Sequence, residues 1–260
     1  EKIALKFDLT EEVAEMFYSS LAIYAKLLKF TEADYVIAPK VDLWDTLIEQ
    51  MLVQKRALNE VVETREHALA CAKTVADRYR CNYEHASFLM EAACMIFDKI
   101  RTLHGLNPHY KLLLEIAAIL HDCGYFINSK HHLNSNVDIV KYTDIYGLTD
   151  KTTLITAYIS RFAESETPNY KDAELASLKG SEKIIALKLA AIFRLANSLD
   201  KSHKQKLQSV KVRLDDDKFI ITAKSDSNTR LEHWAFEKCS AFFQEVFGVQ
   251  PILTVKSSLI

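Results

Sequence analysis

Apolar residues recur at helical spacing along most of the chain. In residues 10–30 an apolar side chain falls every three or four positions, which predicts one amphipathic helix. The same period continues from about residue 52 to 206. Asn, Gly, Pro or polar breaks divide that stretch into predicted helices over residues 55–80, 84–104, 109–123, 131–142, 149–163 and 181–200. The segment 104–108, His-Gly-Leu-Asn-Pro, is the clearest helix end.

The pattern changes to alternation near residue 207. Val210 to Leu214 alternates, three aspartates follow, and Phe219 to Thr222 is again apolar, which predicts a hairpin. A helix over about 229–247 should end at Gly248, and residues 251–255 suit a last short strand. The tail is therefore predicted to be a β-β-α-β unit.

The N-terminal 50 residues suit an α-β-α piece that is too small to form a core alone. Residues 35–38 are a short strand-like run ended by Pro39, and a further helix should start near Asp42. We therefore expect three parts: residues 1–52, a helical domain over 53–206, and a small α+β domain over 207–260. The fold class is mainly α, and the scarcity of Gly (5) and Pro (4) agrees with long helices.

Composition limits the partners. The chain has 33 Lys+Arg against 35 Asp+Glu, so its net charge of -2 gives no general attraction for nucleic acid. No apolar run reaches the roughly 18 residues that span a bilayer, so we expect no membrane partner. The five cysteines include no Cys-x-x-Cys pair and favour buried free thiols in a reducing cytoplasm over a disulfide framework.

The segment with the strongest chemical signal is an almost wholly apolar helix, residues 112–120, that ends in His121-Asp122. A helix that is apolar all round should be buried, so these two polar side chains need partners or a metal ion. Gly124 is expected to take the left-handed conformation and turn the chain away. Alone, the dipeptide more often marks a capped helix end.

Two further residues suggest a metal site. His67 lies on a helix with an apolar stripe, where a lone histidine is more often a satisfied core residue. Asp200 ends a second apolar helix, where the helix dipole disfavours an acid and a bound cation would favour it. His67, His121, Asp122 and Asp200 together would suit one divalent ion, namely Mn, Fe, Ni or Zn and less well Mg, with Asp122 as the catalytic residue.

Basic side chains cluster near both ends of this candidate site. They would form a cationic rim for a phosphate chain or a nucleotide, or else are solvated helix ends. The candidate phosphate-binding residues are Lys130, His131, His132, Arg194, Lys201, His203 and Lys204.

Several motifs together resemble the C-terminal half of the exopolyphosphatase / guanosine pentaphosphate phosphatase family. They are residues 103–106, the segment 114–124 with its His-Asp-Cys-Gly end, His131-His132, residues 189–203, and the tail 231–253 with Glu-Val-Phe-Gly. The order His, His-Asp, Asp also resembles the HD phosphohydrolase superfamily. The likeness covers roughly residues 30–255 and implies an HD-type helical domain followed by a small α/β domain.

The resemblance also implies limits. The family's polyphosphate hydrolysis belongs to N-terminal actin-like ATPase-fold domains, and residues 1–52 are similar only to the end of such a domain. The family's glycine-containing run there reads Asp42-Leu43-Trp44-Asp45-Thr46. Where relatives have Arg-Tyr-His, this chain has Arg161-Phe162-Ala163, so we expect at most one ion. Cys123 stands for the usual Ile and is expected to pack.

Three functions remain open. The chain could bind or hydrolyse polyphosphate or a guanosine polyphosphate as part of an exopolyphosphatase-related protein. It could be an autonomous single-metal HD phosphohydrolase that acts on a nucleotide or other phosphate compound, or a non-catalytic phosphate-binding or dimerisation module. We expect a homodimer, with an interface or a core as the alternatives for Phe236, Phe242, Phe243 and Phe247.

Overall fold

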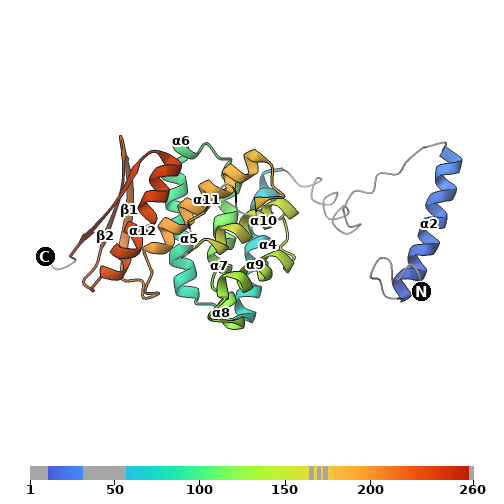
Figure 1. The fold of residues 1–260 in the computed structure, drawn as a ribbon, viewed down its shortest axis with the longest axis horizontal. Helices are drawn as coiled ribbons and strands as arrows, with labels where there is room; N and C mark the ends of the chain where they lie inside the picture. The colour runs from blue at the N-terminus through green and yellow to red at the C-terminus, as the bar shows by residue number, and fades with distance from the viewer. Residues whose placement is uncertain (1–10, 32–56, 164–166, 169–170, 172–174, 258–260) are drawn as a thin grey trace. The chain divides into compact units, whose positions relative to one another are not determined.

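The computed structural model describes residues 11–31, 57–163, 167–168, 171 and 175–257, and divides the chain into two compact units. The first unit, Glu1–Arg56, contains α2 (Glu11–Thr31), which confirms the N-terminal helix (Figure 1). The strand expected at 35–38 and the helix near Asp42 lie outside the described residues. No helix among the described residues is long and apolar enough to cross a membrane.

The second unit, Ala57–Ile260, begins with a series of helices. They are α4 (Ala57–Arg78), α5 (Tyr83–Lys99), α6 (Arg101–His104), the 3-10 helix η1 (Pro108–Tyr110), α7 (Lys111–Leu120), α8 (Gly124–Ile127), α9 (His132–Tyr142), α10 (Asp150–Arg161) and α11 (Gly180–Ser198). Each helix expected between residues 55 and 200 is present. The expected helix 84–104 is divided at Ile100, and Gly105 ends it in the left-handed conformation.

A small sheet and one helix complete the chain as expected. Strands β1 (Gln208–Asp215) and β2 (Lys218–Lys224) form the antiparallel hairpin. Helix α12 (Arg230–Phe247) ends at Gly248 with φ 75°, and β3 (Gln250–Lys256) then pairs parallel with β2. The β-β-α-β order and the mainly helical fold class are both confirmed.

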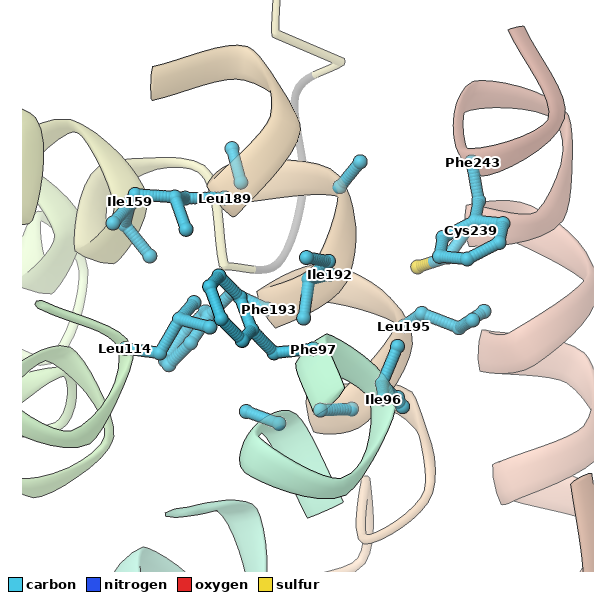
Figure 2. Packing of buried hydrophobic residues seen from close by; sticks show 14 of the residues in the cluster. Ile96, Phe97, Leu114, Ile159, Leu189, Ile192, Phe193, Leu195, Cys239 and Phe243 are labelled. Atoms are coloured by element: carbon cyan, nitrogen blue, oxygen red, sulfur yellow. The ribbon is translucent and has the colours of Figure 1, made fainter. Parts of the chain in front are cut away.

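One hydrophobic core joins the helices to the sheet. Helices α5, α7, α10 and α11 meet around Phe97, Leu114, Ile159 and Phe193, and α12 covers the same cluster with Phe243 (Figure 2). This core crosses the expected boundary at residue 206, because the sheet and α12 bury their apolar faces against α11 and α5. The four phenylalanines of α12 are all buried, so they belong to the core and not to an exposed interface.

Helix α7 lies at the centre of this unit and is buried on every side from Leu113 to Leu120, as its sequence predicts. Its one acidic residue, Glu115, is also buried and pairs with the guanidinium of Arg65 on α4. That ion pair allows a carboxylate inside the core, because each oxygen accepts a hydrogen bond. The helix therefore ends at His121 with a fixed position and direction.

Gly124 has a different role from the expected one. It is helical, not left-handed, since α8 begins at this residue and it has no positive φ. A Cβ there would lie 2.0 Å from the carbonyl oxygen of His132 and 2.9 Å from the amide nitrogen of Asn136. Glycine is needed because α8 and α9 approach each other backbone to backbone.

We predict that Gly124→Ala destabilises the fold by about 3 kcal/mol or more, because rigid backbone must move to admit the methyl group. Gly105→Ala is the matched control. Its Cβ would meet nothing within 4 Å, so it carries only the cost of a left-handed alanine, about 1–2 kcal/mol. Urea unfolding of both variants is the measurement, and equal losses would contradict the close approach of α8 and α9.

His104 is a second buried polar residue with a structural role. Its Nε2 lies 2.9 Å from the carbonyl oxygen of Phe97, and its Nδ1 accepts a hydrogen bond from the amide of Leu106 at 2.8 Å. This pattern requires the neutral tautomer with its proton on Nε2. Burial lowers the pKa of His104 below its usual value.

We predict that His104 makes the fold acid-sensitive. Above about pH 6.5 the imidazole is neutral in the folded and the unfolded chain. As the pH falls from there towards the lower pKa of the folded state, the unfolded chain binds the proton first and the free energy of unfolding decreases. His104→Gln should therefore lose less stability than the wild type between pH 7.5 and 5.5 in urea unfolding. An unchanged dependence on pH would exclude this role.

Candidate functional site

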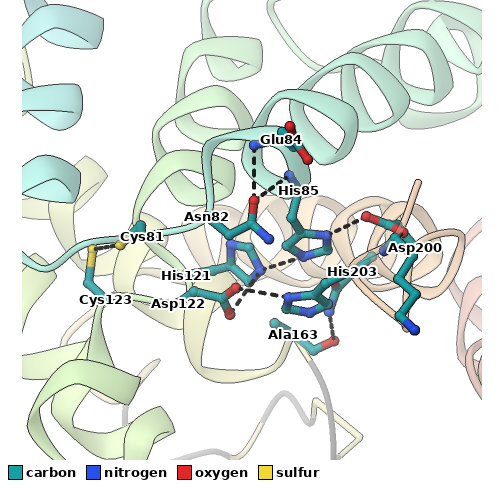
Figure 3. Close-up of polar contacts among 12 residues, drawn as sticks. Cys81, Asn82, Glu84, His85, His121, Asp122, Cys123, Ala163, Asp200 and His203 are labelled. Atoms are coloured by element: carbon teal, nitrogen blue, oxygen red, sulfur yellow. Dashed lines mark hydrogen bonds and ion pairs between the residues drawn. The ribbon is translucent and has the colours of Figure 1, made fainter.

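Histidines and carboxylates from three parts of the chain converge where α5 begins and α7 ends. His85 lies in the first turn of α5, His121 and Asp122 follow the last turn of α7, and Asp200 and His203 follow α11 (Figure 3). His85, His121 and Asp200 are each at most 3 % exposed, which makes their polar contacts decisive.

The start of α5 fixes His85. Asn82 caps the helix, and its side-chain oxygen accepts hydrogen bonds from the amides of Glu84 and His85. His85 then lies on the same buried face as Leu89, Ala92 and Ile96. The apolar stripe of α5 therefore carries an imidazole at its first turn, pointing to the end of α7.

The ring nitrogens of two histidines face each other. Nδ1 of His85 lies 2.8 Å from Oδ2 of Asp200, and Nδ1 of His121 lies 3.0 Å from the carbonyl oxygen of Ala118. Since both partners are acceptors, each Nδ1 carries a proton. The two Nε2 atoms lie 3.1 Å apart, and in neutral rings both present a lone pair.

Two lone pairs at that separation require a positive charge between them. One possibility is a proton on one of the rings, but burial lowers the pKa of His121 and opposes its charged form. The other possibility is a metal ion. Two nitrogens that lie about 2.0–2.1 Å from one ion are roughly 2.9 Å apart in octahedral and about 3.4 Å apart in tetrahedral geometry. The observed 3.1 Å lies between these values.

Asp122 and His203 lie next to the position between these two Nε2 atoms. Oδ1 of Asp122 lies 3.2 Å from Nε2 of His121, and its Oδ2 lies 3.6 Å from Nδ1 of His203. Burial acts to raise the pKa of Asp122, but His121, His203 and His85 outweigh it and hold this pKa below its usual value. The carboxylate is therefore ionised at neutral pH and available to a cation.

His203 stacks on His85, with ring centroids 3.6 Å apart and planes within 9°. Burial and the neighbouring His85 lower the pKa of His203, so this ring is neutral at pH 7. One ligand atom each from His85, Asp122 and His203 lie within 4.8 Å of one another. Among the described residues they form a group with the spacing of a metal site, and His121 Nε2 adjoins two of its members.

Asp200 supports the cluster and does not border the position between the two Nε2 atoms. Its Oδ1 accepts hydrogen bonds from the backbone amides of Lys204 and Gln205, and its Oδ2 from His85 and the Gln205 side chain. Burial acts to raise the pKa of Asp200, but the hydrogen bonds from His85 and Gln205 outweigh it and lower this pKa. Its oxygens accept hydrogen bonds from four donors, so in this structure the carboxylate orients His85, and its predicted role as a ligand stays a prediction.

His67 does not join this cluster. It is exposed on α4, and its ring meets Tyr146 edge-on with centroids 5.9 Å apart. His85 takes the place expected for His67, since it is the histidine whose ring faces His121. The order of histidine, His-Asp and Asp along the chain is retained with a different first member.

The predicted phosphate-binding residues fall in three places: the core, the surroundings of Asp122, and the surface. Arg194 is a correction: it is 4 % exposed, and its Nη1 donates to the carbonyl oxygen of Phe162 at 2.7 Å, so it lies in the core and not at a rim. His132 stacks on Tyr125 and contributes to the low pKa of Asp122. His203 is in the cluster. Lys130, His131 and Lys204 are exposed, and Lys201 is half-buried.

A pocket of about 410 Å³ opens beside the cluster. Asp122 and His203 form one part of its wall, and Tyr79, Tyr125 and Phe126 give it an aromatic part. Arg80 and Asn82 add polar groups, and Cys81 a thiol. Arg80 is exposed and takes a left-handed φ of 53°, which ends α4 and turns the chain into the pocket wall. The pocket therefore joins an anionic and imidazole floor to aromatic and cationic side chains.

A buried cluster of histidines and aspartates beside a pocket marks this region as the candidate functional site of the described residues. The family model for Ppx/GppA phosphatase, domain III, matches residues 69–238, so this chain belongs to the Ppx/GppA phosphatase family. No curated protein matches the chain. The matched range spans both sides of residue 206 and lies inside the range of the resemblance described from the sequence.

His85 was not identified from the sequence, although a signal for it exists. Asn82 is a good N-cap, and a histidine three residues later falls on the apolar stripe of the helix that follows. The same reasoning applies to His67, so the stripe alone does not choose between them. The packing of α5 against α7 and α11 decides that His85, and not His67, faces His121.

Proposed function

We propose that this chain is a metal-dependent phosphohydrolase that acts on a small phosphate compound, with one divalent ion held by His85, His121, Asp122 and His203. The 3.1 Å contact between the two Nε2 atoms carries this proposal, because each ring's Nδ1 is committed to an acceptor. Three imidazoles and one carboxylate suit Mn, Fe, Ni or Zn better than Mg.

The side chains at this site would have different roles. When bound, the ion would lower the pKa of a coordinated water and offset negative charge on a phosphoryl oxygen. Asp122 is ionised and has one oxygen near His121 and the other near His203, so it can bind the ion and accept a proton. Asp200 keeps the His85 ring in the tautomer that leaves Nε2 free.

The pocket favours a phosphate ester with a ring over a bare phosphate chain. Tyr79 and Phe126 meet edge-on at 5.9 Å, and Tyr125 lies beside them in the same wall. Such a wall suits a planar group, while the guanidinium of Arg80 suits a phosphate by paired hydrogen bonds. A nucleotide combines both features and fits a pocket of this volume.

Binding of polyphosphate or a guanosine polyphosphate is the second candidate. The family supports it, and so do basic side chains on two segments next to the cluster, Lys130 with His131 and Lys201 with Lys204. This function needs charge along a surface and does not need an ion at the histidines. Salt dependence separates it from the first candidate, because several phosphate contacts with lysine weaken steeply with salt.

We predict that the purified chain binds one Mn²⁺ or Zn²⁺ ion. Because His85→Ala removes one ligand, it should lower the metal affinity by about 100-fold or more. His67→Ala is the matched control, since it removes an exposed histidine outside the cluster. Isothermal titration with each metal, after treatment with a chelator, gives both affinities. A loss in His67→Ala with normal binding in His85→Ala would exclude the proposed ligand set.

We predict metal-dependent phosphatase activity on nucleoside monophosphates that Asp122→Asn removes by at least 100-fold. Arg80→Ala should raise KM more than it lowers kcat, because Arg80 lines the pocket and binds the phosphate. Arg213→Ala is the matched control, since Arg213 pairs with Asp215 on strand β1.

Release of inorganic phosphate with and without added metal is the measurement. An inactive, metal-free protein whose polyphosphate binding falls with salt and in Lys201→Ala would favour the second candidate. An inactive protein that binds neither metal nor polyphosphate would leave a non-catalytic module.

A further inference from the structure

Two cysteines lie together at the edge of the pocket, Cys81 in its wall and Cys123 buried behind it. Sγ of Cys81 and Sγ of Cys123 are 2.9 Å apart although the residues are 42 positions apart in sequence (Figure 3). All five cysteines of the chain are free. A disulfide needs about 2.05 Å between the sulfurs, so the two thiols would have to approach by about 1 Å.

The backbone holds each thiol in its place. Cys81 lies between Arg80, which is left-handed, and Asn82, which caps α5, and its amide donates to the carbonyl of Ala76. On the other side, the amide of Cys123 donates to the carbonyl of Leu120, just beyond the end of α7. The short distance is therefore set by two turns and not by mobile side chains.

The two thiols differ in access. Cys81 is half-buried and lines the pocket, so a small reagent reaches it from solvent. Cys123 is 0 % exposed and is covered by the cluster of apolar residues around α7, α4 and α9. Cys71 is also half-buried but has no thiol partner, which makes it an internal reference for the reactivity of a single thiol.

We propose that Cys81 and Cys123 form a redox site that closes into a disulfide when a peroxide enters the pocket. The Cys81 sulfur attacks one peroxide oxygen, the O–O bond breaks, and a sulfenic acid and one water result when the oxidant is hydrogen peroxide. The Cys123 sulfur then attacks the Cys81 sulfur, the S–O bond breaks, and the hydroxyl group leaves with the Cys123 proton as a second water. Two thiols and one peroxide give one disulfide and two waters.

A disulfide between Cys81 and Cys123 would affect the candidate site because of where the two residues lie. Cys81 precedes the cap of the helix that carries His85, and Cys123 directly follows Asp122. The disulfide would join the two backbone segments that border the candidate site, and it would close a long loop of the chain. Closing such a loop restricts the unfolded chain, so the disulfide should raise Tm by roughly 5 °C or more for a unit of this size.

Oxidation of the full chain by hydrogen peroxide tests the proposal. After alkylation of remaining thiols and digestion without reductant, mass spectrometry should find the Cys81 and Cys123 peptides linked, with a thiol reductant restoring both. Cys71 should remain alkylated at peroxide doses that link the pair. Cys71→Ala should leave the link and the Tm rise unchanged, whereas Cys81→Ala should abolish both.

The chelator-treated protein should form the same link, so the test does not depend on metal binding or on phosphatase activity. Free Cys81 and Cys123 after treatment that oxidises Cys71 would overturn the proposal. Oxidation of Cys81 to the sulfinic acid without a link to Cys123 would also overturn it, because a thiol in contact would react with the sulfenic acid first.

Discussion

The contact between the Nε2 atoms of His85 and His121 is the constraint on which the candidate site depends. Both rings are buried, and each has its other nitrogen committed, one to Asp200 and one to the carbonyl of Ala118. Two facing lone pairs in a buried place are unfavourable without a positive charge. The fold therefore holds an arrangement that a proton or a metal ion must complete.

Three packing features hold these rings in position. The ion pair between Arg65 and Glu115 lets α7 lie in the core with a charged residue, and the backbone contact at Gly124 fixes the turn after Asp122. The loop after α11 is the third, since it directs two backbone amides onto Asp200. Because these features lie on separate elements, the geometry of the site depends on the whole helical unit.

The sequence predicted the elements because their signals are local. The almost wholly apolar pattern of α7 and the alternating hairpin before α12 depend on neighbours in the chain, and both were confirmed. Contacts between distant residues were not predictable in this way. Arg194 lies in the core because a carbonyl 32 residues away, that of Phe162, accepts its hydrogen bond.

The site was predictable only in part for the same reason. His121 and Asp122 stand out as polar residues at the end of an apolar helix, and they lie at the centre of the cluster. The role of Asp200 depends on the positive φ angles of His203 and Gln205, which turn the loop back on the carboxylate and which no local pattern indicated. The choice between His67 and His85 depends on which helix packs on α7.

Anomalous diffraction from crystals of the zinc-loaded protein tests the central claim most directly. One strong peak should lie between the Nε2 atoms of His85 and His121, at about 2.0–2.1 Å from each, with the Asp122 carboxylate beside it. The absence of a peak there, with a peak at His67 or a direct hydrogen bond between the two rings, would contradict the claim that a metal ion completes this pair.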